Sequence, residues 1–294
     1  MSRTAARGLA ALGLAATLMA GAAPARAAEV TVDAAYGATI GGFPIGAGTL
    51  SFSVARNGEY AASIGAQVTG LAALIANRQA TATTAGRALY GGQISPKAYM
   101  LDIAGGPVPN HVEMALANNA VTNVSASEIR IPGWERRTPV TPAHKRGIVD
   151  PLGAFVISAG KARDPLSAEV CNRTVKVFDG RARYDLHMIY GAKTEVKGEP
   201  GSYSGPALIC AVAYRPIAGF RPLSQAELEY ERNIEFSIVF VPVASTNILI
   251  PHKVVIGTPS GKLVVTASRF KVSGATRTAE ARGEAARSDD GAER

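Results

Sequence analysis

The stretch Arg183-Tyr-Asp-Leu-His-Met-Ile-Tyr190 shows the pattern that decides the fold. Alternate positions are apolar on one side (Tyr184, Leu186, Met188, Tyr190) and polar on the other (Arg183, Asp185, His187). Three further stretches, 30–36, 49–54 and 234–240, alternate in the same way. A period of two residues is typical of half-buried strands in an antiparallel sheet with one wet face. We therefore predict a mainly β protein.

Turn sequences separate these stretches, and helical spacing is confined to short inserts. The turns are Gly41-Gly42-Phe43-Pro44, Asn57-Gly58, Asp179-Gly180 and Ser260-Gly261, and both residues of Asn57-Gly58 tolerate the positive φ of a tight hairpin. Short helical segments are predicted at Leu71, Leu74 and Ile75, after Asp150-Pro151, after Asp164-Pro165, and after Ser224, which forms a capping-box pattern with Glu227. These inserts are too short for a parallel α/β sandwich, so we predict a long antiparallel meander with helices packed on it.

The ends of the chain differ in composition from its middle. Residues 1–27 combine arginines, an uncharged apolar run and the small-x-small sequence Ala25-Arg26-Ala27, which is typical of a cleaved secretory signal peptide. The alternative is an uncleaved anchor. Residues 276–294 lack Val, Ile, Leu and aromatic residues, so we predict a disordered charged tail there. The range 28–275 is then one β-rich domain, in which the Pro-rich, basic segment 132–147 is a connection within one curved sheet; two lobes are the alternative.

Export would place the mature chain in an oxidising compartment, the periplasm, and no later stretch is long and apolar enough to span a membrane. The sequence has two cysteines, Cys171 and Cys210, and an isolated pair in such a compartment is most simply a structural disulfide. A disulfide closing a loop of this length stabilises by about 4 kcal/mol. A redox couple and a metal site are the alternatives, although the C-x-x-C spacing of the first and the clustered ligands of the second are absent.

The charged and polar residues form no pattern that specifies chemistry. The net charge is +8; residues 1–27 contribute +3 and the tail contributes −1, which leaves +6 for residues 28–275, spread among acidic residues. We therefore expect no nucleic-acid partner. The four histidines, His111, His144, His187 and His252, lack metal-ligand spacing, and no phosphate-binding or dinucleotide motif occurs, so no metal or cofactor is expected. His187 is expected to be solvated, and His252 to face inward.

Two longer motifs resemble a known family. They are Cys171-Asn-Arg-Thr-Val-Lys-Val-Phe-Asp-Gly-Arg-Ala-Arg-Tyr-Asp-Leu186 and Tyr203-Ser-Gly-Pro-Ala-Leu-Ile-Cys-Ala-Val-Ala-Tyr-Arg-Pro-Ile-Ala-Gly-Phe-Arg-Pro222. Together with Thr138–His144 and Val149–Leu152, they resemble the domain-of-unknown-function 3108 family of exported proteobacterial proteins. The start of the domain (Tyr36 and Gly42–Gly46) and its end (Gly261 and Ser268–Phe270) also fit, so the resemblance covers about residues 30–271. The resemblance implies that the cysteines are paired and that the sheet is a strongly curved half-barrel like those of periplasmic lipoprotein carriers. It implies no catalytic residue.

Three functions follow as hypotheses. The first is a non-catalytic periplasmic protein of the cell envelope that binds a lipid, another apolar ligand or a segment of an envelope protein in the curved sheet. The inward positions expected to face such a ligand are Leu50, Phe52, Val54, Leu186, Met188, Phe236 and Ile238; the alternative is that they fill a dry core. The second is a scaffold for protein partners. The third is a hydrolase of envelope material, for which Asp150, Asp179, Arg183 and His144 are the residues to inspect.

Overall fold

The computed structural model describes residues 30–74, 76–88, 94–106, 110–128, 134–160 and 162–274. The predicted signal peptide 1–27 and the predicted tail 276–294 lie outside them. One antiparallel sheet of 14 strands makes up most of the fold, which confirms the predicted class. Its strands are β1 (Val30–Ile40), β2 (Phe43–Val54), β3 (Glu59–Val68), β4 (Gln79–Ala88), β5 (Ile94–Ala104), β6 (Asn110–Ala117), β7 (Ala120–Ala126), β8 (Ile157–Ser158), β9 (Arg173–Phe178), β10 (Arg183–Val196), β11 (Gly205–Ala218), β12 (Phe236–Pro242), β13 (Ile248–Thr258) and β14 (Gly261–Ser273).

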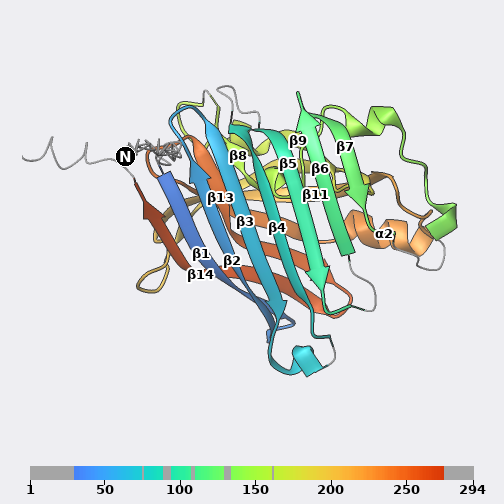
Figure 1. The fold of residues 1–294 in the computed structure, drawn as a ribbon. Coiled ribbons are helices and arrows are strands. Elements are labelled where there is room, and N and C mark those ends of the chain that lie inside the picture. Colours follow the sequence, from blue (N-terminus) through green and yellow to red (C-terminus); the bar gives the residue numbers. More distant parts are fainter. Residues whose placement is uncertain are drawn as a thin grey trace, which may run out of the picture.

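The sheet consists of two meanders joined by the first and last strands. Its order is β7-β6-β5-β4-β3-β2-β1-β14-β13-β12-β11-β10-β9, and β8 pairs with β13 outside this path. Strand β1 pairs along its length with β14, from Thr31 opposite Ser273 to Ile40 opposite Leu263. Figure 1 shows the β1–β7 half lying in front of strands from the β9–β14 half, so the sheet folds back on itself.

The two outer edges of the curved sheet, β7 and β9, are linked by residues 146–149, at and just after the end of the predicted connection 132–147. Arg146 bridges to Ala120 of β7, and Val149 bridges to Val177 of β9. The Ile148 amide donates to the Asn119 carbonyl (2.9 Å), just before β7. Unpaired strand edges expose hydrogen-bonding groups. This segment pairs with part of each edge, so the barrel-like sheet is bridged rather than closed by strand pairing.

The turns follow their sequences with one exception. Gly41 and Gly42 both have positive φ (55° and 90°), as a two-residue hairpin requires. At Asn57-Gly58, only Gly58 has positive φ (79°), because strands β2 and β3 are joined by a four-residue loop rather than a two-residue turn.

The helices are short, as predicted. They are η1 (Gly70–Leu74), η2 (Trp134–Arg136), η3 (Pro142–Lys145), η4 (Gly153–Phe155), α1 (Ala168–Cys171) and α2 (Gln225–Asn233). Ser224 and Glu227 form the expected capping box of α2. Helix α2 extends to Asn233, and Ile234, predicted as a strand residue, is its C-cap. Strand β12 therefore begins two residues later, at Phe236.

The interior contains three apolar clusters. One lies between the β1–β3 region and β12–β14, a second surrounds the disulfide, and a third lies between β4–β6 and the connection. Cys171 and Cys210 are bonded in the second cluster, with Cα atoms 5.5 Å apart, and both are fully buried. The disulfide therefore attaches α1 to β11 within a packed core.

Candidate functional site

A cavity of about 370 Å³ lies inside the curved sheet, bounded by β1–β5 on one side and by the segment 151–156 with β13 and β14 on the other. Its lining is almost entirely apolar. The larger side chains around it are Tyr36, Leu50, Phe52, Ile64, Tyr99, Leu101, Leu152, Phe155, Val156, Ile250, Val254 and Val265. This volume lies at the lower end of the ~300–1,000 Å³ range of small-molecule sites.

The cavity exists because small residues form part of its wall. Gly48, Ala62, Ala66 and Ala82 line it from three neighbouring strands, β2 to β4. Gly48 lies directly opposite Ala66 in the β2–β3 pairing. Large apolar residues at these positions would fill the space, as they do in a packed sheet interior.

The cavity wall formed by the segment 151–156 is held in place by a buried carboxylate. Asp150 is fully buried, and its Oδ1 accepts hydrogen bonds from the amides of Leu152 and Gly153 (2.9 Å each). Its Oδ2 accepts one from Thr84 Oγ1 of β4 (2.9 Å). Asp150 therefore accepts hydrogen bonds from the amides at the start of the predicted helical segment, and also attaches this segment to the sheet. Burial raises the pKa of Asp150 to about 6, although these hydrogen bonds oppose the shift.

The hydroxyl of Tyr36, a residue of the cavity wall, is bonded to the backbone. The Tyr36 hydroxyl donates to the Pro251 carbonyl (2.7 Å), and burial raises the pKa of this phenol. Because this hydroxyl is bonded to the backbone, Tyr36 presents mainly its ring to the cavity. The site can therefore hold an apolar group through contact area, with few polar anchors.

The predicted ligand-facing residues divide between this cavity and the packed interior. Leu50 and Phe52 line the cavity. Val54 is buried in the first apolar cluster. The other four belong to the cluster around the disulfide: Leu186, Met188 and Ile238 are buried in it, and Phe236 packs against it half-buried.

Sequence reasoning missed several lining residues on strands that it did not examine. Ile64 and Ala66 of β3, Leu101 of β5 and Val265 of β14 are examples. The alternation Tyr60, Ala62, Ile64, Ala66 was a usable signal for an inward face, and its small residues are what leave space.

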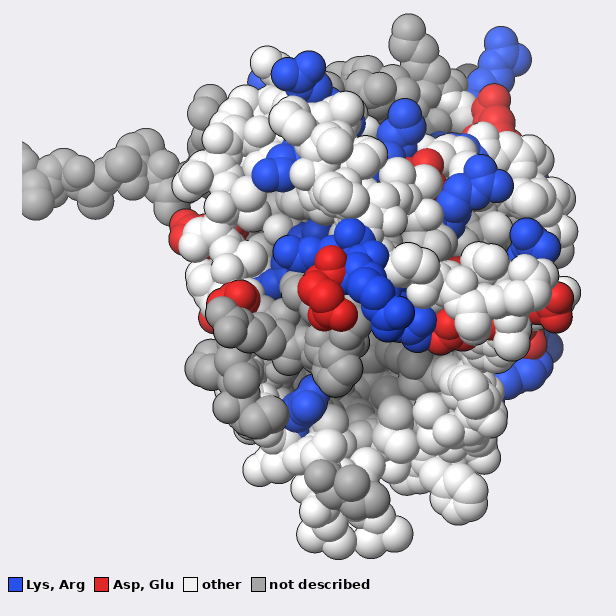
Figure 2. Space-filling view, turned by 90° about the vertical axis from the view of Figure 1, so that its right-hand side faces the viewer, with Lys and Arg blue, Asp and Glu red and all other residues white. Residues whose placement is uncertain are grey.

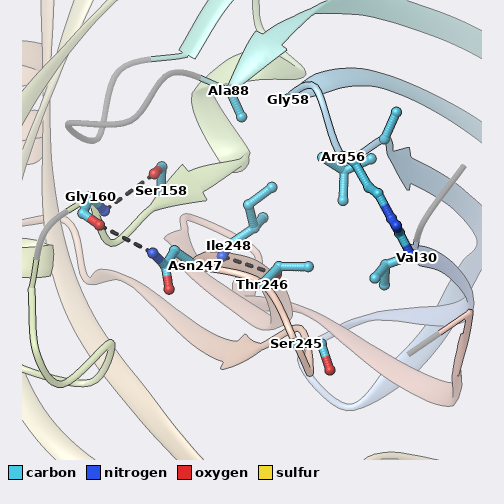
Figure 3. Close-up of a pocket in the computed structure, with 12 residues that line it drawn as sticks. Val30, Arg56, Gly58, Ala88, Ser158, Gly160, Ser245, Thr246, Asn247 and Ile248 are labelled. Atoms are coloured by element: carbon cyan, nitrogen blue, oxygen red, sulfur yellow. Dashed lines mark hydrogen bonds between the residues drawn. The ribbon is translucent and has the colours of Figure 1, made fainter. Parts of the chain in front are cut away.

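A second cavity, of about 400 Å³, lies at the opposite end of the strands (Figure 3). It is lined by the start of β1, the β2–β3 loop and the 245–248 turn, including Arg56. Asn247 donates from its side chain to the Gly160 carbonyl (3.3 Å), and Gly160 donates to Ser158 Oγ (3.2 Å). The polar groups of Asn247 and Ser158 are thus used in joining loops.

The four residues inspected for hydrolysis interact with other partners. Asp150 caps its turn, and Asp179 accepts from the amides of Arg181 and Ala182 (2.8 and 2.6 Å). Arg183 is paired with Asp185, and His144 Nδ1 accepts from the Thr141 amide (3.1 Å). Within the described ranges, no hydrogen bond or ion pair joins any two of the four.

The remaining histidines lie apart from one another in the fold. His111 Nδ1 is 2.7 Å from Asp102 Oδ1. His252 is buried and faces inward as expected. His187, expected to be solvated, is half-buried: its Nε2 is buried, and its Nδ1 lies 2.9 Å from Thr174 Oγ1 on the neighbouring strand. The part of the chain that the structure describes contains no group of three His, Cys, Asp or Glu residues able to hold a metal ion.

Comparisons with known proteins give one structural likeness. No family model matches the chain, and no curated protein matches it. The chain is similar to a solved β-barrel-like protein of domain of unknown function DUF1849 from Brucella abortus, with 11% identity, 83% of this chain and 98% of that chain covered, and a TM-score of 0.47. Among the described residues, no helix has the length and apolar character needed to cross a membrane.

Proposed function

We propose that the protein is a non-catalytic component of the cell envelope that binds a small apolar molecule, such as a fatty acid, in the cavity inside its curved sheet. The observation that carries the proposal is the combination of about 370 Å³ of space with an almost wholly apolar lining. An empty cavity of this size leaves its lining side chains without the packing contacts that are made elsewhere in the sheet interior. A bound apolar molecule would supply those contacts.

The proposal includes a periplasmic location and membership of a family of exported proteins. The sequence of residues 1–27 supports export to the periplasm. The motifs 171–186 and 203–222 support membership of the domain-of-unknown-function 3108 family. The disulfide between Cys171 and Cys210 is consistent with an oxidising compartment.

The test is titration of the delipidated mature chain with a dansyl-labelled fatty acid, whose fluorescence rises in an apolar site. The variant Ala66→Trp adds a large side chain at an exposed position of the cavity wall, whereas Ala61→Trp adds it to the outer face of the same strand. We expect about tenfold or weaker binding for Ala66→Trp and unchanged binding for Ala61→Trp. Absence of saturable binding by the unmodified chain, or equal binding by both variants, would refute the proposal.

A further inference from the structure

Three large apolar side chains project into solvent at one end of the molecule. Phe43 is 74% exposed, Leu71 82% and Leu74 84%, which are the highest values among the large hydrophobic residues exposed in the structure. Phe43 follows the tight Gly41-Gly42 turn, and the leucines lie on η1, the short helix after β3. Figure 1 shows η1 as the lowest element of the fold. The spacing of Leu71 and Leu74 predicted a helix, but the helix does not bury them.

The two segments that carry these side chains lie next to each other. The Thr69 amide donates to the Ile45 carbonyl (3.0 Å), which joins the start of η1 to the β1–β2 hairpin. A Cβ atom on Gly70 would lie 3.5 Å from the Pro44 carbonyl oxygen. Phe43, Leu71 and Leu74, which we call the apolar tip, therefore belong to one end of the sheet.

The cavity opens toward this end. Along β2, inward Phe52 is buried, and inward Leu50, nearer the tip, is half-buried. Along β3, exposure rises toward the tip at successive inward positions: Ala62 is buried, Ile64 is half-buried and Ala66 is exposed. On β13 and β14 the lining residues Val254 and Val265 are also half-buried. The apolar tip thus stands beside the mouth of the cavity.

This end of the molecule carries few charges. The ranges 36–54, 60–77 and 254–261 contain no Asp, Glu, Lys or Arg. The charged residues that border them at this end are Arg78 and Lys262, and Lys262 is paired with Glu235 (2.6 Å). In Figure 2 the lower end shows mostly uncharged residues, and the charged side chains gather above it. The described chain also starts and ends at the far end of the strands, where Thr31 pairs with Ser273.

We propose that the apolar tip docks on the surface of a lipid bilayer and that the apolar ligand enters the cavity from the bilayer. This inference rests on the proposed function. Transfer of exposed Phe and Leu side chains from water to the acyl region is favourable, and a surrounding with few charges limits the cost of dehydrating ions there. The same arrangement lets a ligand leave the bilayer without crossing water.

The test is cosedimentation of the mature chain with vesicles of phosphatidylcholine. The double variant Leu71→Ser/Leu74→Ser removes most of the tip, and Met100→Ser/Ile189→Ser is the matched control, since both of those residues are exposed elsewhere on the sheet. We expect the tip variant to bind at least about tenfold more weakly and the control to bind as the unmodified chain does. Because the contact is apolar, binding should persist in 0.5 M salt, a concentration chosen to screen charges (Debye length of roughly 4 Å).

Three results would overturn the inference. The first is equal vesicle binding by the tip variant and the control. The second is binding only to phosphatidylglycerol vesicles, with loss of that binding in salt. The third is that the unmodified chain self-associates instead of binding vesicles, and that Leu71→Ser/Leu74→Ser abolishes the self-association. The dansyl-labelled fatty acid in vesicle-free buffer separates this inference from the proposed function. Both double variants should bind that probe normally. Failure of the unmodified chain to bind it would refute the proposed function and, with it, ligand entry from the bilayer, whereas docking of the apolar tip is decided by the cosedimentation.

Discussion

Thr84 of β4 donates a hydrogen bond to the fully buried carboxylate of Asp150, 66 residues further along the chain. This contact attaches the segment 151–156, which forms one wall of the cavity, to the strands that form the other. The position of the wall therefore depends on a carboxylate that has no cation bonded to it in the described structure.

The Asp150 contact predicts a pH dependence of stability. Because burial raises the pKa of Asp150 from 3.8 to about 6, the folded state favours the protonated form. The resulting stability is fully present below about pH 4 and is lost as the pH rises through 6, a loss of about 3 kcal/mol. Asp150→Asn keeps an oxygen for the two amides and does not ionise, so this variant should lack that loss.

Urea unfolding at pH 4 and pH 7 measures this effect as the difference between the unmodified chain and Asp150→Asn. If both chains change by the same amount between the two pH values, Asp150 is not the group responsible.

Arg181 is predicted to hold the bridged edges of the sheet together. Its guanidinium, on the turn between β9 and β10, donates to the carbonyls of Ser127 and His111 (2.9 Å each). Arg181→Met should cost about 1–3 kcal/mol of unfolding free energy, because it leaves the Ser127 carbonyl without this donor. Arg136→Met is the control, since the Arg136 side chain is 74% exposed and should be nearly neutral.

Hydrogen exchange gives a local readout for Arg181. Amides of β6 and β7 should exchange faster in Arg181→Met, while those of β1 and β14 should be unchanged. Uniform acceleration throughout the sheet would instead indicate a general loss of stability.

The disulfide is predicted to stabilise the region around α1. The pair Cys171 and Cys210 closes a loop with a sequence separation of 39 residues, so replacing both with Ala should lower the free energy of unfolding by about 4 kcal/mol. Urea titrations with and without a phosphine reductant provide the measurement. The unmodified chain should lose stability on reduction and the double variant should not; insensitivity of both would show that the pair is not bonded in solution.

Local patterns predicted much of this fold. Alternation identified the inward residues of β2 and, in β10, the buried Leu186 and Met188. It was wrong at the ends of the β10 stretch: Tyr190, predicted to face inward, is exposed beside a register shift, and Arg183, predicted to lie on the polar face, is buried. Gly41-Gly42 formed the expected hairpin, and Ser224 with Glu227 capped a helix. These features depend on residues that are close in sequence. Asn118-Asn119, whose residues both have positive φ in the β6–β7 turn, is a comparable signal that went unused.

The site could be predicted only in part. Leu50 and Leu186 have the same inward pattern, yet one lines a cavity and the other is packed beside a disulfide. The difference depends on which residues face them across the folded sheet, and that is decided by strands far apart in sequence. Likewise, the spacing of Leu71 and Leu74 could not show that nothing in the described structure covers them.

Methyl NMR of the mature chain during titration with oleate tests the central claim most directly. We predict saturable shifts for the methyl groups of cavity residues Leu50, Ile64, Leu101 and Val254, and none for Leu186 and Met188 in the packed cluster. Unperturbed cavity methyls at saturating oleate, or shifts confined to Leu186 and Met188, would contradict an apolar ligand site inside the sheet.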